Sequence, residues 1–169
     1  MKAELKAKLL KNLNPKNQDQ GFTLIELLVV IIIIGILSVI ALPTFLKQAA
    51  KARQSEAKNN VDAMNRSQQV YYLENQTFTE DINMLSIGIS SSNNYSYFSV
   101  ATADGITSGV ANKAKALESD LKGYAGGVFR TAGQTTQTIM CEVLIAGTDL
   151  PESPNSGSAC DAATQTRMK

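Results

Sequence analysis

Residues 21–46 read GFTLIELLVVIIIIGILSVIALPTFL, and they form the most apolar stretch of the 169-residue chain. From Phe22 to Leu46 there are 25 residues, and Glu26 is the only ionisable one. A helix of that length extends about 37 Å at 1.5 Å per residue, which exceeds the roughly 30 Å of a bilayer core. The pattern therefore predicts a helix that is long enough to cross a membrane.

Glu26 is the one residue that does not fit a plain apolar span. Placing a carboxylate in hydrocarbon costs on the order of 2.5–3.5 kcal/mol, so such a group is expected to have a partner. No basic side chain lies between Phe22 and Leu46. Cleavage of the chain before Phe22 would create an α-amino group about one helical turn from Glu26, and that group carries the required opposite charge.

Three other interpretations of this stretch explain less of it. A secretory signal has an apolar region of about 7–15 residues and then a small-residue cleavage site. Here the run is longer, and the small residues around Ala50 come too late after Leu46. A simple membrane anchor explains the length but neither Glu26 nor the glycine before Phe22. A buried helix of a soluble protein is rarely apolar on every face over so many residues.

The stretch resembles the class III signal of the type IV pilins and their pseudopilin relatives. The resemblance is carried by a basic leader followed by Gly21, Phe22, Glu26, Gly35 and Pro43. In that family a membrane peptidase cuts after the glycine and N-methylates the phenylalanine, and the glutamate is thought to neutralise the amino terminus of a neighbouring subunit. The resemblance implies cleavage between Gly21 and Phe22, methylation of Phe22, and an assembly charge pair at Glu26.

Residues 1–21 read as a leader that processing would remove. They contain five lysines and two acidic residues, which favours a cytoplasmic N-terminus, although basic residues such as Lys47 also follow the apolar run closely. The family resemblance places the leader inside and the globular part in the periplasm. The leader is longer than in many pilins, and in this it resembles the cyanobacterial major pilins.

Composition argues against an enzyme. Removal of the 21-residue leader leaves 148 residues with 11 basic and 13 acidic side chains, so there is no strong signal for nucleic-acid binding. The chain has no histidine and two cysteines, which removes the commonest catalytic base and the commonest zinc ligands. We expect no catalytic residue, no cofactor and no metal site.

Cys141 and Cys160 lie 19 positions apart near the C-terminus. A disulfide is expected if this part of the chain lies outside the cytoplasm, and it would stabilise the fold by about 3 kcal/mol in the chain-entropy model. Two free thiols buried in a core are the alternative. Many pilins have a similar C-terminal disulfide loop that holds the tail on the sheet. Pro151, Pro154 and Gly157 exclude regular structure from most of the intervening loop.

The helix is predicted to continue to about Glu74, because residues 47–74 contain neither glycine nor proline and are rich in good helix formers. Pro43 removes one hydrogen bond, so a kink or loosening is expected near it and Gly35. Apolar residues predicted to form one stripe are Leu46, Ala50, Ala57, Val61, Met64 and Tyr71. The predicted opposite face contains Arg53, Glu56, Lys58, Asn59, Asp62 and Arg66.

Residues 75–169 are predicted to form the globular part. Residues 75–94 read as a connecting loop with one short helical turn. Strands are predicted at 95–100, 123–131 and 137–145, whereas 104–120 is ambiguous and 111–121 could form a short helix. The fold class is therefore α+β: a long N-terminal helix, apolar in residues 22–46 and amphipathic in residues 47–74, packed on a small antiparallel sheet.

The resemblance implies a structural subunit of a type IV pilus, used for motility, adhesion or DNA uptake. Such a subunit is a single-pass precursor in the inner membrane, surrounded by lipid, before it joins a homopolymeric extracellular filament. The implied partners are further copies of the chain, the prepilin peptidase, the inner-membrane assembly machinery and an outer-membrane secretin. Alternatives are a type II secretion pseudopilin, a minor pilin, or a membrane-anchored binding module that does not polymerise.

Overall fold

The computed structural model describes residues 22–133 and 135–168, so the predicted leader, including Gly21, lies outside the described residues. Its elements are α2 (Leu24–Asn75), the 3-10 helix η1 (Ile82–Leu85), β1 (Tyr95–Ala101), β2 (Gly109–Ala116), β3 (Tyr124–Arg130), β4 (Thr136–Val143) and β5 (Gln165–Arg167). The chain divides into two units, Met1–Pro43 and Thr44–Lys169, which are described separately below.

In the unit that ends at Pro43, the described residues form the first part of α2. Every side chain from Phe22 to Pro43 is exposed, and the most apolar stretch has a mean hydropathy of 3.1. By length and composition this part of α2 can cross a membrane. Pro43 is itself helical, and α2 continues from it into the second unit.

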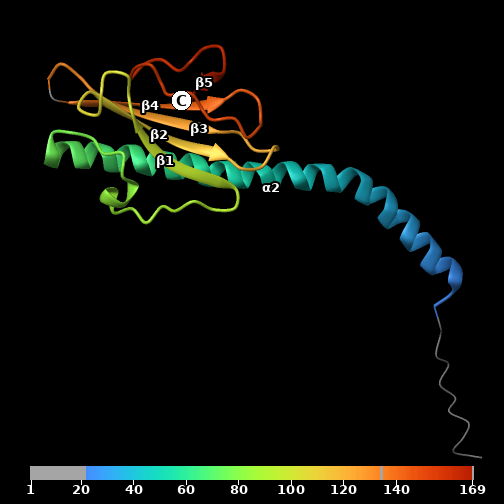
Figure 1. Ribbon diagram of the computed structural model, residues 1–169. Coiled ribbons are helices and arrows are strands. Elements are labelled where there is room, and N and C mark those ends of the chain that lie inside the picture. Colours follow the sequence, from blue (N-terminus) through green and yellow to red (C-terminus); the bar gives the residue numbers. More distant parts are fainter. Residues whose placement is uncertain (1–21, 134, 169) are drawn as a thin grey trace, which may run out of the picture. The chain divides into compact units, whose positions relative to one another are not determined.

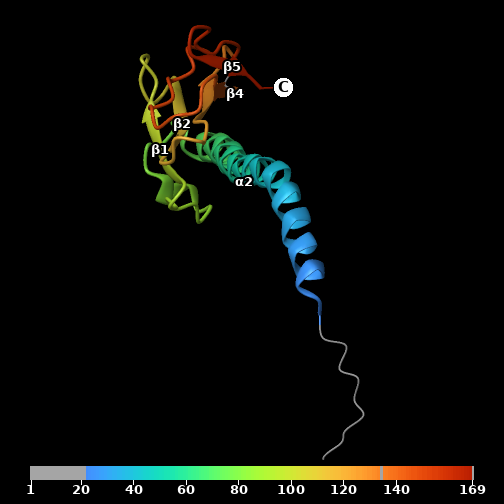
Figure 2. The same cartoon turned by 90° about the vertical axis from the view of Figure 1, so that its right-hand side faces the viewer.

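In the second unit, which we call the globular unit, α2 lies along one face of the sheet (Figures 1 and 2). The predicted stripe is confirmed at Ala57, Val61 and Met64, which are fully buried. It is wrong at Tyr71, because Tyr72 is the buried tyrosine and stacks on Phe78 with ring centroids 4.8 Å apart. It is also wrong at Leu46, which is 56% exposed because the sheet does not extend that far along the helix.

The five strands form one antiparallel sheet in the order β1-β2-β3-β4-β5. The predicted α+β arrangement is confirmed. The short helix considered for residues 111–121 is wrong: residues 109–116 form β2, which pairs on both sides and is buried over almost its whole length. Central pairing overrides the helix propensity of its Ala and Lys residues. The three residues of β5 carried no strand signal, and they pair with β4 beside the disulfide.

A buried polar network lies between α2 and the centre of the sheet. The Asn112 amide donates to the side-chain oxygen of Asn65 at 2.8 Å, and the Ser99 hydroxyl donates to Asn112 at 2.7 Å. Asn65 in turn donates to the carbonyl of Ile139 at 3.4 Å. Because unpaired buried amides are costly, this set of bonds favours one position of the helix on the sheet. Gly126 provides the room that Asn65 needs.

The other face of the sheet is partly covered by the C-terminal loop. Strand alternation puts Lys113 and Cys141 on this face, and Cys141 is joined to Cys160 in the loop. Lys113 is only 6% exposed, and burial lowers the pKa of its ammonium group, while the nearby Glu152 acts in the opposite direction. Pro151 is fully buried in this layer.

The segment between α2 and β1 is held by a buried side chain of the helix. Gln68 donates to the carbonyl of Thr79 at 2.6 Å and accepts from the Thr79 amide at 3.1 Å, as a neighbouring strand would. The same segment supplies Glu80, whose carboxylate accepts from the backbone amide of Ala101 at 2.7 Å. This contact covers part of the edge strand β1, and covered edges resist pairing with other chains.

Gly126→Ala is expected to destabilise the globular unit by about 1–3 kcal/mol, because overpacking of a filled core costs that much. The added Cβ would lie 2.5 Å from the side-chain amide of Asn65 and 2.7 Å from Val61. Urea unfolding of the full chain in detergent micelles, followed by tyrosine circular dichroism, measures this loss. The matched control is Gly147→Ala, since its added Cβ would meet nothing within 4 Å. Equal stability of the two variants would contradict the packing argument.

Candidate functional site

The candidate site is the first turn of α2. Thr23 precedes the helix, and its hydroxyl accepts from the backbone amide of Glu26 at 3.3 Å. In return, Glu26 Oε2 accepts from the backbone amide of Thr23 at 2.9 Å and from its hydroxyl at 2.7 Å. This reciprocal arrangement is a capping box, which satisfies amide groups that have no partner inside the helix.

The capping box uses only one of the two carboxylate oxygens of Glu26. Both of its bonds from Thr23 end on Oε2, and no hydrogen bond or ion pair between described residues reaches Oε1. A carboxylate accepts through both oxygens, so Oε1 can receive an external donor while Oε2 keeps the cap. All three bonds use atoms of Thr23 and Glu26, and a cut before Phe22 would leave each of them in place.

The side chains around this carboxylate are apolar, and they are exposed in the described part of the chain. Phe22 is 83% exposed, and the exposed side chains of Ile25 and Leu28 flank Glu26 along the helix. The residues predicted to loosen the helix, Gly35 and Pro43, both lie inside α2, and a Cβ on Gly35 would meet nothing within 4 Å. The predicted kink stays a prediction.

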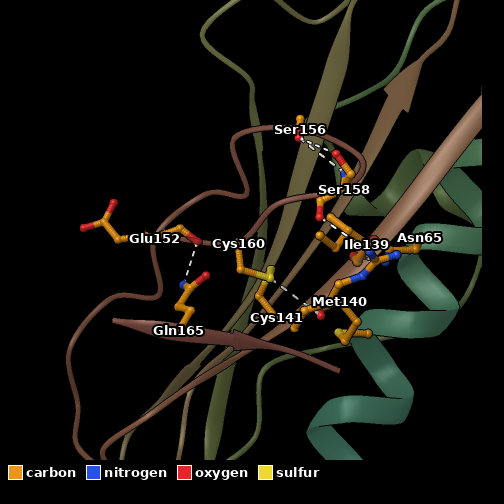
Figure 3. The surroundings of a disulfide bond; sticks show 10 residues. Asn65, Ile139, Met140, Cys141, Glu152, Ser156, Ser158, Cys160 and Gln165 are labelled. Atoms are coloured by element: carbon orange, nitrogen blue, oxygen red, sulfur yellow. Dashed lines mark hydrogen bonds between the residues drawn. A yellow bond between two sulfur atoms is a disulfide. The ribbon is translucent and has the colours of Figure 1, made fainter. Parts of the chain in front are cut away.

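The second predicted feature is the disulfide, and the structure joins Cys141 of β4 to Cys160 of the C-terminal loop (Figure 3). Cys141 is fully buried, and the two Cα atoms lie 5.9 Å apart. Next to it, Gln165 of β5 donates to the carbonyl of Glu152 at 2.9 Å, which ties the loop back to the sheet. The disulfide therefore holds the covering layer of the sheet and lies in a different unit from Glu26.

Two family models match the chain. The model for type IV pilin-like G and H proteins matches residues 54–166, and the prokaryotic N-terminal methylation motif matches residues 16–42. The first match extends over most of the amphipathic part of α2, over β1 to β4 and over the first two residues of β5. The chain belongs to the type IV pilin-like family. The second match contains Phe22 and Glu26.

Individual relatives of this pilin-like chain agree with the family. It is 42% identical over 84 residues to the type IV major pilin PilA of Myxococcus xanthus. The aligned residues cover 50% of this chain and 37% of PilA. It is 33% identical over 118 residues to the fimbrial protein EcpC of Eikenella corrodens, covering 70% of this chain and 76% of EcpC. It is also 35% identical over 63 residues to the type II secretion system core protein G of Aeromonas hydrophila, covering 37% and 44%.

The extent of these matches differs between relatives. The chain spans about a third of PilA and less than half of core protein G, but about three quarters of EcpC. Within residues 22–133 and 135–168, this pilin-like chain has no group of three or more His, Cys, Asp or Glu side chains that could hold a metal ion.

Sequence reasoning missed Thr23 as a functional residue of this pilin-like chain. The signal was readable, because Thr-Leu-Ile-Glu from Thr23 to Glu26 matches the capping-box pattern directly before an apolar run. The Thr23 hydroxyl carries no charge, so an argument from opposite charges does not identify it as a partner of Glu26.

Thr23→Ala is expected to weaken the first turn of α2, because losing a cap costs about 0.5–2 kcal/mol. Hydrogen exchange of the Glu26 amide should become several-fold faster in the full chain in micelles. Thr23→Ser keeps a hydroxyl at the same place and should exchange as the unaltered chain does. Unchanged exchange in Thr23→Ala would show that the cap does not stabilise this end.

Joint replacement of Cys141 and Cys160 by serine is expected to destabilise the globular unit by about 3 kcal/mol, through the greater freedom of the unfolded 19-residue loop. The urea midpoint of the full chain in micelles measures the change. Treating the unaltered chain with a reductant should give the same midpoint shift. A loss of unfolding free energy below a few tenths of a kcal/mol would mean that the loop is held by its packing alone.

Proposed function

We propose that the chain is the structural subunit of a type IV pilus. Support comes from the family match over the globular unit and from a helix half that is exposed on all sides within its own chain. An apolar surface of this kind is stable either in lipid or against other apolar helices. The precursor would occupy the inner membrane with its globular unit in the periplasm, and the assembled subunit would lie in an extracellular filament.

Processing is the first step of this proposal. A prepilin peptidase cuts between Gly21 and Phe22 and methylates the new amino group of Phe22. The methylation motif match contains the cut, and the high exposure of Phe22 leaves this residue accessible to an enzyme. Because the cap of α2 uses only Thr23 and Glu26, the helix keeps its first turn after the leader has left.

Pairing of Glu26 with a neighbouring subunit is the second step, and the observation that carries it is that both bonds from Thr23 end on Oε2 of Glu26. Oε1 of Glu26 accepts a hydrogen bond from the methylated ammonium group of Phe22 of an adjacent subunit, while Oε2 keeps its hydrogen bonds from Thr23. A subunit placed out of register would leave a carboxylate buried without a partner, which costs several kcal/mol. The pair therefore selects the axial position of each added subunit.

The resulting polymer is head-to-tail and helical, because donor and acceptor lie on different copies and the contact does not close. Lipid contacts of residues 22–46 are exchanged for helix contacts in the filament core. The inner-membrane assembly machinery and an outer-membrane secretin would be the further partners. The filament would serve motility, adhesion or DNA uptake.

Glu26→Gln is expected to abolish filament assembly while leaving membrane insertion intact. Glutamine keeps the capping box but removes the charge, so the variant separates helix stability from pairing. The readout is filament yield in sheared surface fractions beside the amount of precursor in membranes. Glu56→Gln is the matched control, since Glu56 is another exposed glutamate of α2. Normal filament yield from Glu26→Gln would refute the pairing.

Mass spectrometry of sheared surface protein tests processing independently. We expect a chain that begins with N-methylated Phe22. A surface protein that still begins with residues 1–21 would refute processing, whatever the filament yield.

A second candidate function is a pseudopilin of a type II secretion system, favoured by the similarity to core protein G. A pseudopilin would also be cleaved and methylated, so mass spectrometry does not separate the two. Long surface filaments that disappear in a deletion strain, with secretion unchanged, would favour the pilus subunit. Loss of secretion without loss of filaments would favour the pseudopilin.

A further inference from the structure

The globular unit exposes an apolar patch in the loop between β4 and β5. Leu144, Ile145 and Leu150 are 47%, 80% and 51% exposed, and we call these three residues the loop patch. They line an open hollow of about 450 Å³ together with both apolar and acidic residues, among them Pro151 and Asp149. Exposed apolar side chains that cluster in this way make the loop patch a candidate contact surface.

The loop patch lies at the end of the globular unit where the chain enters it at Thr44. Strand β4 runs antiparallel to α2, since Gln69 donates to Thr136 at the start of β4 and Asn65 donates to the Ile139 carbonyl further along. The loop patch follows Val143, the last residue of β4. Figure 1 shows this loop and the β2–β3 loop at the same end of the sheet.

Contacts with α2 give the level of this end along the helix. The amide of Gly147 donates to the carbonyl of Leu121 at 2.9 Å. In the same β2–β3 loop, the Asp120 carboxylate lies 4.0 Å from the Arg53 guanidinium, and the Tyr124 hydroxyl that follows donates to Gln54 at 3.4 Å. Arg53 is seven residues after Leu46, so these loops lie about 10 Å beyond the last residue of the apolar run.

That distance is comparable to the depth of a membrane interface. Headgroups add about 5–8 Å on each side of the hydrocarbon core, and amphipathic segments bury their apolar face by about 5–10 Å at this boundary. Lys47 and Lys51 are exposed between Leu46 and this level, where their charges suit anionic headgroups. Asp149, in the same loop, restricts the contact to the headgroup layer, because a carboxylate does not enter hydrocarbon cheaply.

We propose that, in the membrane-anchored precursor, the loop patch docks on the lipid surface on the side of the membrane that holds the globular unit. This inference rests on the membrane anchoring proposed above. The lipid surface is the occupant because the lipid-facing surface of α2 ends at Leu46 and the loop patch begins about 10 Å further on in the same unit. Docking holds the globular unit against the bilayer until the subunit is extracted.

The chain has no tryptophan, so one substitution introduces a single fluorescent probe. Ile145→Trp places it in the loop patch. Val70→Trp is the matched control: Val70 is 55% exposed on α2, and it lies 17 residues beyond Arg53, or about 25 Å further along the helix. Both full-length variants are reconstituted in vesicles of phosphatidylethanolamine and phosphatidylglycerol, with and without brominated acyl chains.

We expect blue-shifted emission from Ile145→Trp and about a twofold loss of intensity on bromination, since a tryptophan in the headgroup layer lies next to the acyl boundary. Val70→Trp should emit as a water-exposed tryptophan and stay unquenched. Equal, weak quenching of both variants would overturn the docking. A blue shift without quenching by bromine would also overturn it, because the probe would then be covered by a second copy or another protein.

Two further measurements keep the outcomes separate. Flotation of the chain with vesicles after an alkaline wash tests anchoring: a chain that does not float refutes the membrane-anchor proposal and the docking with it. A chain that floats but shows no quenching refutes the docking alone. Leu150→Trp is the second probe, used if Ile145→Trp lowers the stability of the globular unit, and the same quenching pattern is expected from it.

Discussion

A single helix must satisfy two different surroundings, and the rest of the molecule depends on this constraint. In the unit that ends at Pro43, α2 exposes isoleucine, leucine and valine on every side, and the described residues provide nothing to cover them. Removing such a surface from water is the dominant favourable term in folding and association. From Thr44 onward the same helix has an apolar face on one side only, and the sheet covers it. The globular unit therefore covers the apolar face of its part of α2, whereas the described residues of the other unit leave theirs exposed.

The first turn of α2 shows how a charge is accommodated in apolar surroundings. Thr23 satisfies half of the Glu26 carboxylate through the capping box and leaves the other oxygen open to a donor. A local hydrogen bond moderates the cost of an ionised group but does not neutralise its charge. The cap therefore stabilises the turn within a single subunit, and in the proposed filament the remaining negative charge would favour one position of a second subunit.

The globular unit is held by two layers that act on opposite faces of one sheet. On the helix side, the amides of Asn65 and Asn112 favour a single register between α2 and the strands. On the other side, the disulfide and Pro151 keep a largely irregular loop in place. Both layers end at the loops that contact Arg53 and Gln54, and the exposed loop patch lies beside those loops. The bond from Gly147 to Leu121 ties these loops together, which would allow three exposed apolar residues to meet a lipid surface at once.

The amino-acid sequence by itself determined the features that depend on local pattern. The apolar run, Glu26, the amphipathic continuation and the order of helix before strands follow from composition and periodicity, because each element carries its own signal. Tertiary structure alone decided that residues 109–116 form the interior strand β2, that Tyr72 rather than Tyr71 is buried, and that β5 exists. These outcomes depend on neighbours distant in the chain: pairing on both sides outweighs local propensity, and the sheet selects which helical residue it covers.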